Sequence, residues 1–236
     1  MQLSLHSDYA LRVLIALAAG DQQLSVEEIA RRYGIRFCGP NSVGVINAHT
    51  GAISSFSQAA DGKALQPGAM ALVSQSGNFG TFMIELAARR GIAFSHFVST
   101  GNEANLSFLD FAEYLVADDK VGAVVGYVEG LRDSVRLRDI GMRARARKTP
   151  IILVKVGRSE AAARSAKSHT GAIVGNDALY DAAFAQAGII RADHEEEVLD
   201  ALPLLMGGIL PAGPRVGIVS ISGGGATIMA DACAAE

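Results

Sequence analysis

The sequence predicts an α/β protein built on a doubly wound, mostly parallel β-sheet. From Pro67 onward, short apolar runs alternate with longer amphipathic runs, which is the pattern of repeated strand, helix, strand units. The composition agrees, because 50% of the 236 residues are hydrophobic but only 6% are aromatic. Such a chain packs its core mainly with Ala, Val, Ile and Leu, as is typical of α/β proteins.

Five strands and five helices are expected in this region. The apolar runs predict strands at residues 69–74, 93–98, 122–128, 151–156 and 188–190. The amphipathic runs predict helices at residues 79–90, 107–116, 133–147, 177–186 and 195–205. Five parallel strands with helices between them form a flavodoxin-like domain, in which the loops after the strands gather at one crevice where ligands bind.

Smaller segments are expected on both sides of this domain. The first segment is a helical, helix-turn-helix-like remnant, whose second helix begins with a capping box between Ser25 and Glu28. The last segment runs from an apolar stretch into a glycine-rich loop, which predicts a truncated βα unit that starts a second α/β domain. The expected divisions are therefore residues 1–36, a linker region at 37–68, the flavodoxin-like domain at 69–210, and 211–236.

Charge and cysteine content argue against several classes of protein. The net charge is -3, which gives no overall attraction to nucleic acid or to an anionic membrane. The arginines between Arg132 and Lys148 are spaced around an amphipathic helix, which favours a solvated face over a nucleic-acid patch. No uncharged apolar run is long enough to span a membrane. Cys38 and Cys233 predict no disulfide scaffold, so we expect a cytoplasmic protein.

Three loops carry residues suited to phosphate chemistry. His169 stands among small residues in the segment 167–173, which leaves room for a phosphoryl group. Residues 74–80 run from a strand through small residues into a helix, so their backbone N–H groups can face an anion. Glu129 ends an otherwise uncharged strand. In a doubly wound sheet these three loops converge at one edge.

This convergence predicts phosphoryl transfer through a histidine. Glu129 would hold one ring nitrogen of His169 so that the other attacks, and the helix ends at Gly77 and Gly175 would stabilise the phosphate charge. Simpler interpretations stay open: an exposed histidine without a role, a tight βα turn, and a carboxylate that caps a helix. Metal binding is a weaker alternative, because His169 has no second His or Cys at ligand spacing.

Five motifs in register resemble the α part of NDP-forming acyl-CoA synthetases, which are relatives of succinyl-CoA synthetase. The likeness runs from about residue 35 to the end, and its motifs are residues 39–45, 74–80, 99–104, 127–130 and 167–172. The resemblance implies that acyl-CoA, phosphate and ADP give the free acid, CoA and ATP through an acyl phosphate and a phosphohistidine. The resemblance further implies an enzyme role, that of a fragment of an acid-thiol ligase.

The resemblance also implies the roles of individual residues. It makes His169 the phosphorylated residue and Glu129 its orienting carboxylate. The implied phosphate-binding residues are Ser76, Gly77, Asn78, Thr170 and Gly171, and the residues on the CoA side are Pro40, Asn41 and Ser42.

The family pattern further implies missing parts and partners. Only the last segment of a CoA-binding domain, about residues 36–46, is expected here, and no ATP-grasp domain. ADP or ATP with Mg²⁺ would therefore bind to an ATP-grasp subunit or domain that acts as partner, while the small-molecule partner is an acyl-CoA. Both homo-oligomers and hetero-oligomers are compatible with the resemblance.

Residues 1–36 resemble a different family, the redox-sensing winged-helix transcription repressors. The likeness lies in the segments 1–12 and 25–30. It leaves open an alternative function, an acyl-CoA-responsive regulatory or DNA-binding fusion protein without catalysis. However, Gly39 and Pro40 stand where the base-reading helix of such a repressor would run, so nucleic acid is not expected as a partner.

Overall fold

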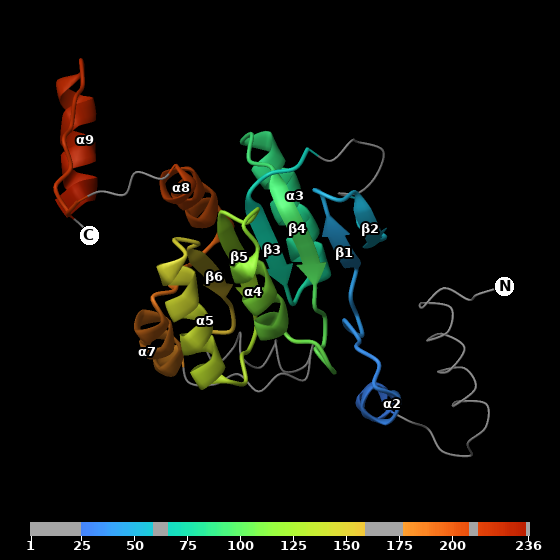
Figure 1. Ribbon diagram of the computed structural model, residues 1–236. Coiled ribbons are helices and arrows are strands. Elements are labelled where there is room, and N and C mark those ends of the chain that lie inside the picture. Colours follow the sequence, from blue (N-terminus) through green and yellow to red (C-terminus); the bar gives the residue numbers. More distant parts are fainter. Residues whose placement is uncertain (1–24, 59–65, 159–176, 208–211, 235–236) are drawn as a thin grey trace.

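A seven-stranded sheet forms the centre of the protein (Figure 1). The computed structural model describes residues 25–58, 66–158, 177–207 and 212–234. The strand order is β2-β1-β4-β3-β5-β6-β7. The strands are β1 (Gly44–Asn47), β2 (Ala52–Ser55), β3 (Met70–Ser74), β4 (Phe94–Ser99), β5 (Ala123–Val128), β6 (Ile151–Lys155) and β7 (Ile190–Ala192).

The five predicted strands are β3 to β7, and all of them are parallel. β3 pairs with both β4 and β5, and the sheet continues through β6 to β7. The parallel order is therefore second, first, third, fourth, fifth along the chain, which is the flavodoxin order. Every residue of β3, β4 and β6 is buried, as expected for strands covered on both faces. The predicted fold class is confirmed.

Helices cover both faces of the parallel sheet. α4 (Phe108–Ala117), α5 (Ser134–Ala146) and α7 (Asp177–Ala187) contribute to one hydrophobic cluster, and α3 (Gly77–Arg89) and α8 (Glu195–Met206) contribute to the other. Alternate residues of a strand pack into the two clusters. In β3, Ala71 and Val73 pack into the first cluster, and Met70 and Leu72 pack into the second. These helices match the five predicted ones to within about two residues, the usual uncertainty of helix ends.

A hairpin of β1 and β2 extends the sheet beyond the predicted strands. The sequence predicts no strand in residues 37–68, but Gly44–Asn47 pairs antiparallel with both β2 and β4. Each hairpin strand has only four residues, and most of β2 is exposed, so neither shows the apolar run that marks a buried strand. Pairing with β4, about fifty residues away in the chain, fixes the hairpin.

The two flanking helices in the described ranges lie outside this sheet (Figure 1). α2 (Val26–Tyr33) begins with the predicted capping box, in which Glu28 N–H donates to Ser25 Oγ and Ser25 N–H to Glu28 Oε2. α9 (Gly223–Ala234) has no buried residue. Residues 215–220, where a strand is expected before α9, form neither helix nor strand. Within the described ranges, no helix is both long and apolar enough to cross a membrane.

Candidate functional site

The candidate site lies where the parallel strands end. Ser74, Ser99, Val128 and Lys155 are the last residues of β3, β4, β5 and β6. Neighbouring parallel strands bring their carboxyl ends to one edge, where loops are free to bind ligands. Of the predicted site residues, seven lie in the described part of the chain: Pro40, Asn41, Ser42, Ser76, Gly77, Asn78 and Glu129. His169, Thr170 and Gly171 lie outside the described residues.

The loop after β3 presents the N-terminus of α3. Ser74 Oγ donates to the Ser76 carbonyl oxygen at 2.6 Å and accepts from Ser76 N–H at 3.2 Å, which closes the turn. Ser76 then caps the helix, its Oγ accepting from the N–H of Phe79. For the N–H groups of Gly77 and Asn78, no acceptor is recorded among the described residues. These two amides and the positive end of the helix are therefore available to an anion, as predicted.

Gly77 is also required by packing. A Cβ atom on Gly77 would lie 2.5 Å from Val43 Cγ1, closer than two carbon atoms can approach. Val43 precedes β1, so the first turn of α3 sits directly against the segment that leads into the hairpin. The predicted phosphate loop and the predicted CoA-side segment are thus in contact.

The CoA-side segment lies on the loop after β4. Asn102 N–H donates to the Pro40 carbonyl oxygen at 2.9 Å, and Asn41 Nδ2 donates to Asn102 Oδ1 at 3.3 Å. Ser42 Oγ donates to the Ser99 carbonyl oxygen at 2.5 Å. These contacts join segments about sixty residues apart in the chain and bring Pro40, Asn41 and Ser42 to the same sheet edge as α3.

Gln75 joins the loop after β3 to the loop after β5. Its Oε1 accepts from the N–H of Glu129 at 2.5 Å and from that of Gly130 at 3.2 Å, and its Nε2 donates to the Gly130 carbonyl oxygen at 2.9 Å. Its own N–H donates to the Tyr127 carbonyl oxygen at 3.0 Å. One side chain therefore hydrogen-bonds three backbone groups of the Glu129–Gly130 turn. These bonds fix the backbone conformation just after β5, where Glu129 lies.

Glu129 is a buried carboxylate at this edge, with 8% of its surface exposed. Tyr127, two residues earlier, stacks on Phe79 of α3 with 4.2 Å between ring centroids. Burial raises the pKa of Tyr127, and the negative charge of Glu129 raises this pKa further. The ring pair and the Gln75 contacts hold the end of β5 against the N-terminal turn of α3.

Glu103 is a second carboxylate at the edge that the sequence does not single out as a site residue. Its Oε1 accepts from Thr100 Oγ1 and from the N–H of Phe108, both at 2.8 Å. Burial raises the pKa of Glu103, although hydrogen bonds from Gln75, Thr100 and Phe108 act in the opposite direction. The available signal was its place in the motif 99–104, just after a buried strand.

Lys155 is a buried cation at the end of β6, and the sequence does not predict a role for it. Only 3% of the residue is exposed. The signal was a single lysine in the run Ile151–Val156, which is otherwise apolar. Gln75 stands in the motif 74–80, but its role depends on which loop lies opposite, and the sequence does not show this.

A cavity in the described part of the protein lies elsewhere. It encloses about 390 Å³ beside α4 and the β1–β4 pair. Its lining residues are Arg36, Val45, Ile46, Asn47, Ala52, His96, Val98, Leu106, Asp110, Phe111, Tyr114 and Leu115. None of these is a predicted site residue, so the candidate site is defined by strand ends and not by this cavity.

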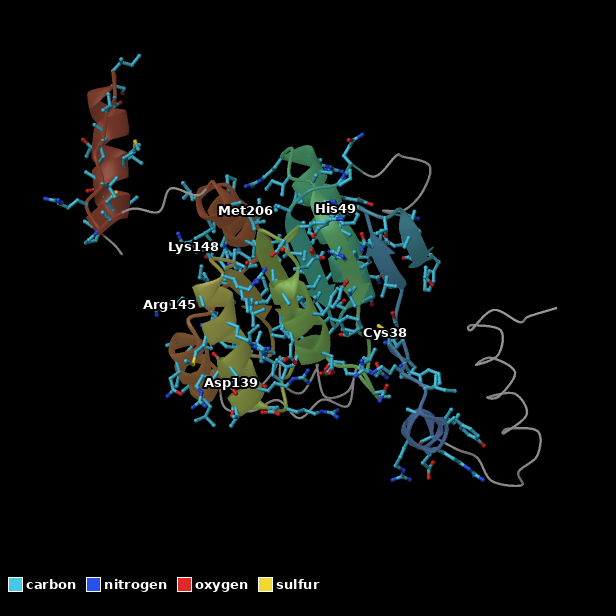
Figure 2. The ribbon with its side chains drawn as sticks, in the orientation of Figure 1. Cys38, His49, Asp139, Arg145, Lys148 and Met206 are labelled. Carbon is cyan, nitrogen blue, oxygen red and sulfur yellow. The ribbon has the colours of Figure 1, made fainter. Side chains whose placement is uncertain are left out.

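The basic run on α5 is a solvated face. Arg136 pairs with Asp110 and Glu113, Arg143 pairs with Glu113, and Arg147 pairs with Asp119. Figure 2 shows Arg145 and Lys148 projecting outward at the end of α5, and both are exposed. Most arginines of this helix therefore form ion pairs with neighbouring acidic residues.

Comparison with known protein families and sequences gives one consistent result. The model of the family "Succinyl-CoA ligase like flavodoxin domain" matches residues 67–205. An ADP-forming acetate–CoA ligase of Archaeoglobus fulgidus is 36% identical over 228 residues, which cover 93% of this chain and 32% of that protein. The α subunit of acetate–CoA ligase II (ADP-forming) of Pyrococcus furiosus is 36% identical, with 89% of this chain and 44% of that subunit covered.

The alignment with the Archaeoglobus protein leaves only 7% of this chain uncovered, so it must extend into residues 1–36. Part of that segment thus aligns with a ligase. The likeness of this segment to repressors stays a prediction.

Solved structures agree with the sequence comparisons. The dinucleotide-forming acetyl-coenzyme A synthetase 1 of Ca. Korarchaeum cryptofilum, in complex with phosphate and ADP, superposes with a TM-score of 0.71 at 34% identity. The superposition covers 79% of this chain and 40% of that one. The chain thus spans less than half the length of these relatives. The family model covers more than half of the 236 residues, and this chain belongs to the family of succinyl-CoA ligase-like flavodoxin domains.

Proposed function

We propose that this chain is the phosphohistidine-carrying part of an NDP-forming acyl-CoA synthetase. The observation that carries the proposal is the arrangement at one sheet edge of a buried carboxylate, Glu129, and the open N-terminus of α3. The names of the relatives, ADP-forming acetate–CoA ligases, supply the reaction class. Because the chain spans less than half of each relative, the proposal assigns it one part of the reaction.

The proposed reaction has three balanced steps. Phosphate attacks the thioester carbonyl of an acyl-CoA, which forms an acyl phosphate and releases CoA. A ring nitrogen of His169 then attacks phosphorus, the bond from phosphorus to the acyl oxygen breaks, and the acid leaves as its carboxylate. Finally ADP takes the phosphoryl group from the imidazole, which yields ATP and restores the neutral ring.

The residues of this chain have distinct roles in the proposal. Glu129 accepts a hydrogen bond from one ring nitrogen of His169, which leaves the other nitrogen free to attack. The proposed phosphate donors are Ser76, Gly77, Asn78, Thr170 and Gly171. The N–H groups of Gly77 and Asn78, which have no acceptor among the described residues, support this assignment, since they can donate to phosphate oxygens.

The proposed partners follow from the same reaction. Pro40, Asn41 and Ser42 lie on the CoA side, and an ATP-grasp subunit or domain holds ADP or ATP with Mg²⁺. The Pyrococcus relative is named as an α subunit, which supports a partner subunit. The low cysteine content favours a reducing compartment, so the proposed compartment is the cytoplasm.

The proposal is tested by phosphorylating the full chain. Radiolabelled acetyl phosphate serves as an acyl phosphate that needs no nucleotide domain, and labelled ATP with Mg²⁺ and an ATP-grasp partner serves in a second arm. We expect an acid-labile, base-stable phosphate on the wild-type chain and none on His169→Asn. His194→Asn is the matched control, because His194 is exposed at the start of α8, and it should label normally. Label that persists in His169→Asn would refute the assignment.

A further inference from the structure

Among the described residues, Lys155 is the most deeply buried cation. It ends β6 and exposes only 3% of its surface, whereas lysines are rarely so buried without a partner. An uncompensated ammonium in an apolar interior costs several kcal/mol in solvation. The surroundings of Lys155 must therefore stabilise its charge.

Tyr180 of α7 holds the ammonium in place. Lys155 Nζ lies 4.4 Å from the centroid of the Tyr180 ring, within the range of a cation–π interaction. Nζ also donates to the carbonyl oxygen of Val156. The Tyr180 hydroxyl accepts from the N–H of Leu131 at 3.1 Å, so the same ring is tied to the loop that carries Glu129. Phe184, which is buried, packs edge-on against Tyr180 with 5.9 Å between ring centroids.

Strand register brings Lys155 beside the Glu129 turn. Lys155 is the partner of Val128 in the β5–β6 pair, and Val156 N–H donates to the Val128 carbonyl oxygen at 3.2 Å. Glu129 is the next residue after Val128. Glu129 exposes 8% of its residue surface and Lys155 3%, so little solvent screens their charges from each other.

Other charges also face Lys155. Burial lowers the pKa of Lys155, and the positive charge of Arg191 lowers it further, while Asp177 and Glu129 act in the opposite direction. Asp177 already pairs with Arg191 at 2.7 Å and with Arg158 at 3.3 Å. Asp177 attracts Lys155 more strongly than Glu129 does, but two arginines also pair with Asp177. Glu129 follows the residue of the neighbouring strand that is in register with Lys155.

We propose that Lys155, held by Tyr180, is a positioning residue that offsets the negative charge of Glu129 at the phosphoryl-transfer edge. For its consequence in catalysis, this inference rests on the proposed function. A phosphoryl group approaching the edge brings further negative charge close to a buried carboxylate, and like charges in such a place repel strongly. The fixed ammonium lowers this repulsion and forms or breaks no bond itself.

The first experiment is a double-mutant cycle on folding, which involves described residues only. Lys155→Met keeps the length of the side chain and removes its charge, and Glu129→Gln removes the other charge. Urea unfolding is measured for the wild type, both single variants and the double variant. We expect Lys155→Met to reduce the folding equilibrium constant about tenfold more when Glu129 is present than in the Glu129→Gln background.

Asp177→Asn gives the matched control cycle. If Lys155 instead offsets the charge of Asp177 in α7, the loss of folding stability caused by Lys155→Met will be smaller in the Asp177→Asn background. It will not be smaller in the Glu129→Gln background, and this result would overturn the inference. Should Lys155→Met not fold, as judged by circular dichroism, Lys155→Gln takes its place in both cycles. It also removes the charge but keeps a polar end, and the same coupling to Glu129 is expected.

The second experiment measures the rate of His169 labelling by acetyl phosphate under conditions where every variant is folded. We expect Lys155→Met to slow labelling about tenfold or more in the wild-type background, with partial recovery in Lys155→Arg. In the Glu129→Gln background the same substitution should change the rate little. A purely structural lysine would give equal penalties in both backgrounds and refute the charge-offset role.

The two experiments separate the two claims. A wild-type chain that folds but takes no label refutes the proposed function, while the folding cycle still decides whether Lys155 and Glu129 are coupled. If the chain is labelled at His169 but the effects of the Lys155 and Glu129 substitutions are additive, the proposed function stands. Only the inference about Lys155 is then refuted.

Discussion

The side-chain oxygen of Gln75 lies 2.5 Å from the backbone nitrogen of Glu129. The two residues are 54 positions apart in the chain, and they come from the ends of neighbouring strands β3 and β5. The contact links the loop that offers helix amides to the loop that offers a carboxylate. The two halves of the proposed phosphate site are thus joined by one amide side chain.

Replacing Gln75 by Met should destabilise the protein. The change leaves the N–H groups of Glu129 and Gly130 and the Gly130 carbonyl oxygen without their present partner. Each unpaired group costs about 1–3 kcal/mol when it stays shielded from water, so we expect a total loss of about 2 kcal/mol or more. Urea unfolding measures the change. Gln186→Met on the exposed side of α7 is the control, and equal losses in both variants would contradict the linking role.

Gly77→Ala should also destabilise the protein, and Val43 should account for much of the loss. The added Cβ would meet Val43 Cγ1 at 2.5 Å and force the start of α3 away from the hairpin segment. Overpacking of this kind costs about 1–3 kcal/mol. In the double variant with Val43→Ala, the two branches of Val43 are gone, and the penalty of Gly77→Ala should fall by at least half. Thermal unfolding of the four chains tests this, and simple additivity of the two changes would count against the packing argument.

Stability should fall as the pH drops through the range in which His96 would gain a proton. Burial lowers the pKa of His96 from its ordinary 6.5; His49 and Lys120 also lower it, and Asp118 acts in the opposite direction. Neither ring nitrogen has a hydrogen-bond partner among the described residues. Below about pH 6.5 the unfolded chain therefore binds a proton that the folded chain resists, so the free energy of unfolding falls with decreasing pH.

Comparison of His96→Leu with the wild type between pH 8 and pH 5 measures this contribution. In the acidic part of the range, the free energy of unfolding should fall more steeply for the wild type than for the variant. The difference should be up to about 1.4 kcal/mol per pH unit. His194→Asn serves as control, because that imidazole is exposed beside Glu196 and Glu197. An identical pH dependence in the wild type and His96→Leu would show that His96 is not the group responsible.

The chain should not bind duplex DNA at moderate salt. Arg136, Arg143 and Arg147 of α5 already pair with acids, so few cations of this helix remain for phosphate contacts. A gel shift at about 50 and 200 mM salt tests this expectation, because nonspecific complexes weaken steeply over that range. A complex that survives at the higher salt would favour the regulatory alternative suggested by residues 1–36.

The elements with local signals were predictable from the sequence. β3 and β6 are apolar on both faces, so their runs stand out without knowledge of their neighbours. Ser25 and Glu28 form their capping box within one helical turn. Glu129 was recognisable because a carboxylate ends an uncharged strand, and its place at the sheet edge is confirmed. The closeness of His169 to Glu129 stays a prediction, since His169 lies outside the described residues.

The sequence by itself thus determined the parallel sheet, its helices and the edge at which chemistry is expected, because these depend on periodicity and on residues that are neighbours in the chain. Only the tertiary structure decided that the β1–β2 hairpin joins the sheet, that Gln75 binds the Glu129 turn and that Lys155 stands beside it under Tyr180. Each of these contacts joins residues between 25 and about 55 positions apart. Strand order and register, which are set by packing of the whole sheet, decide which of them meet.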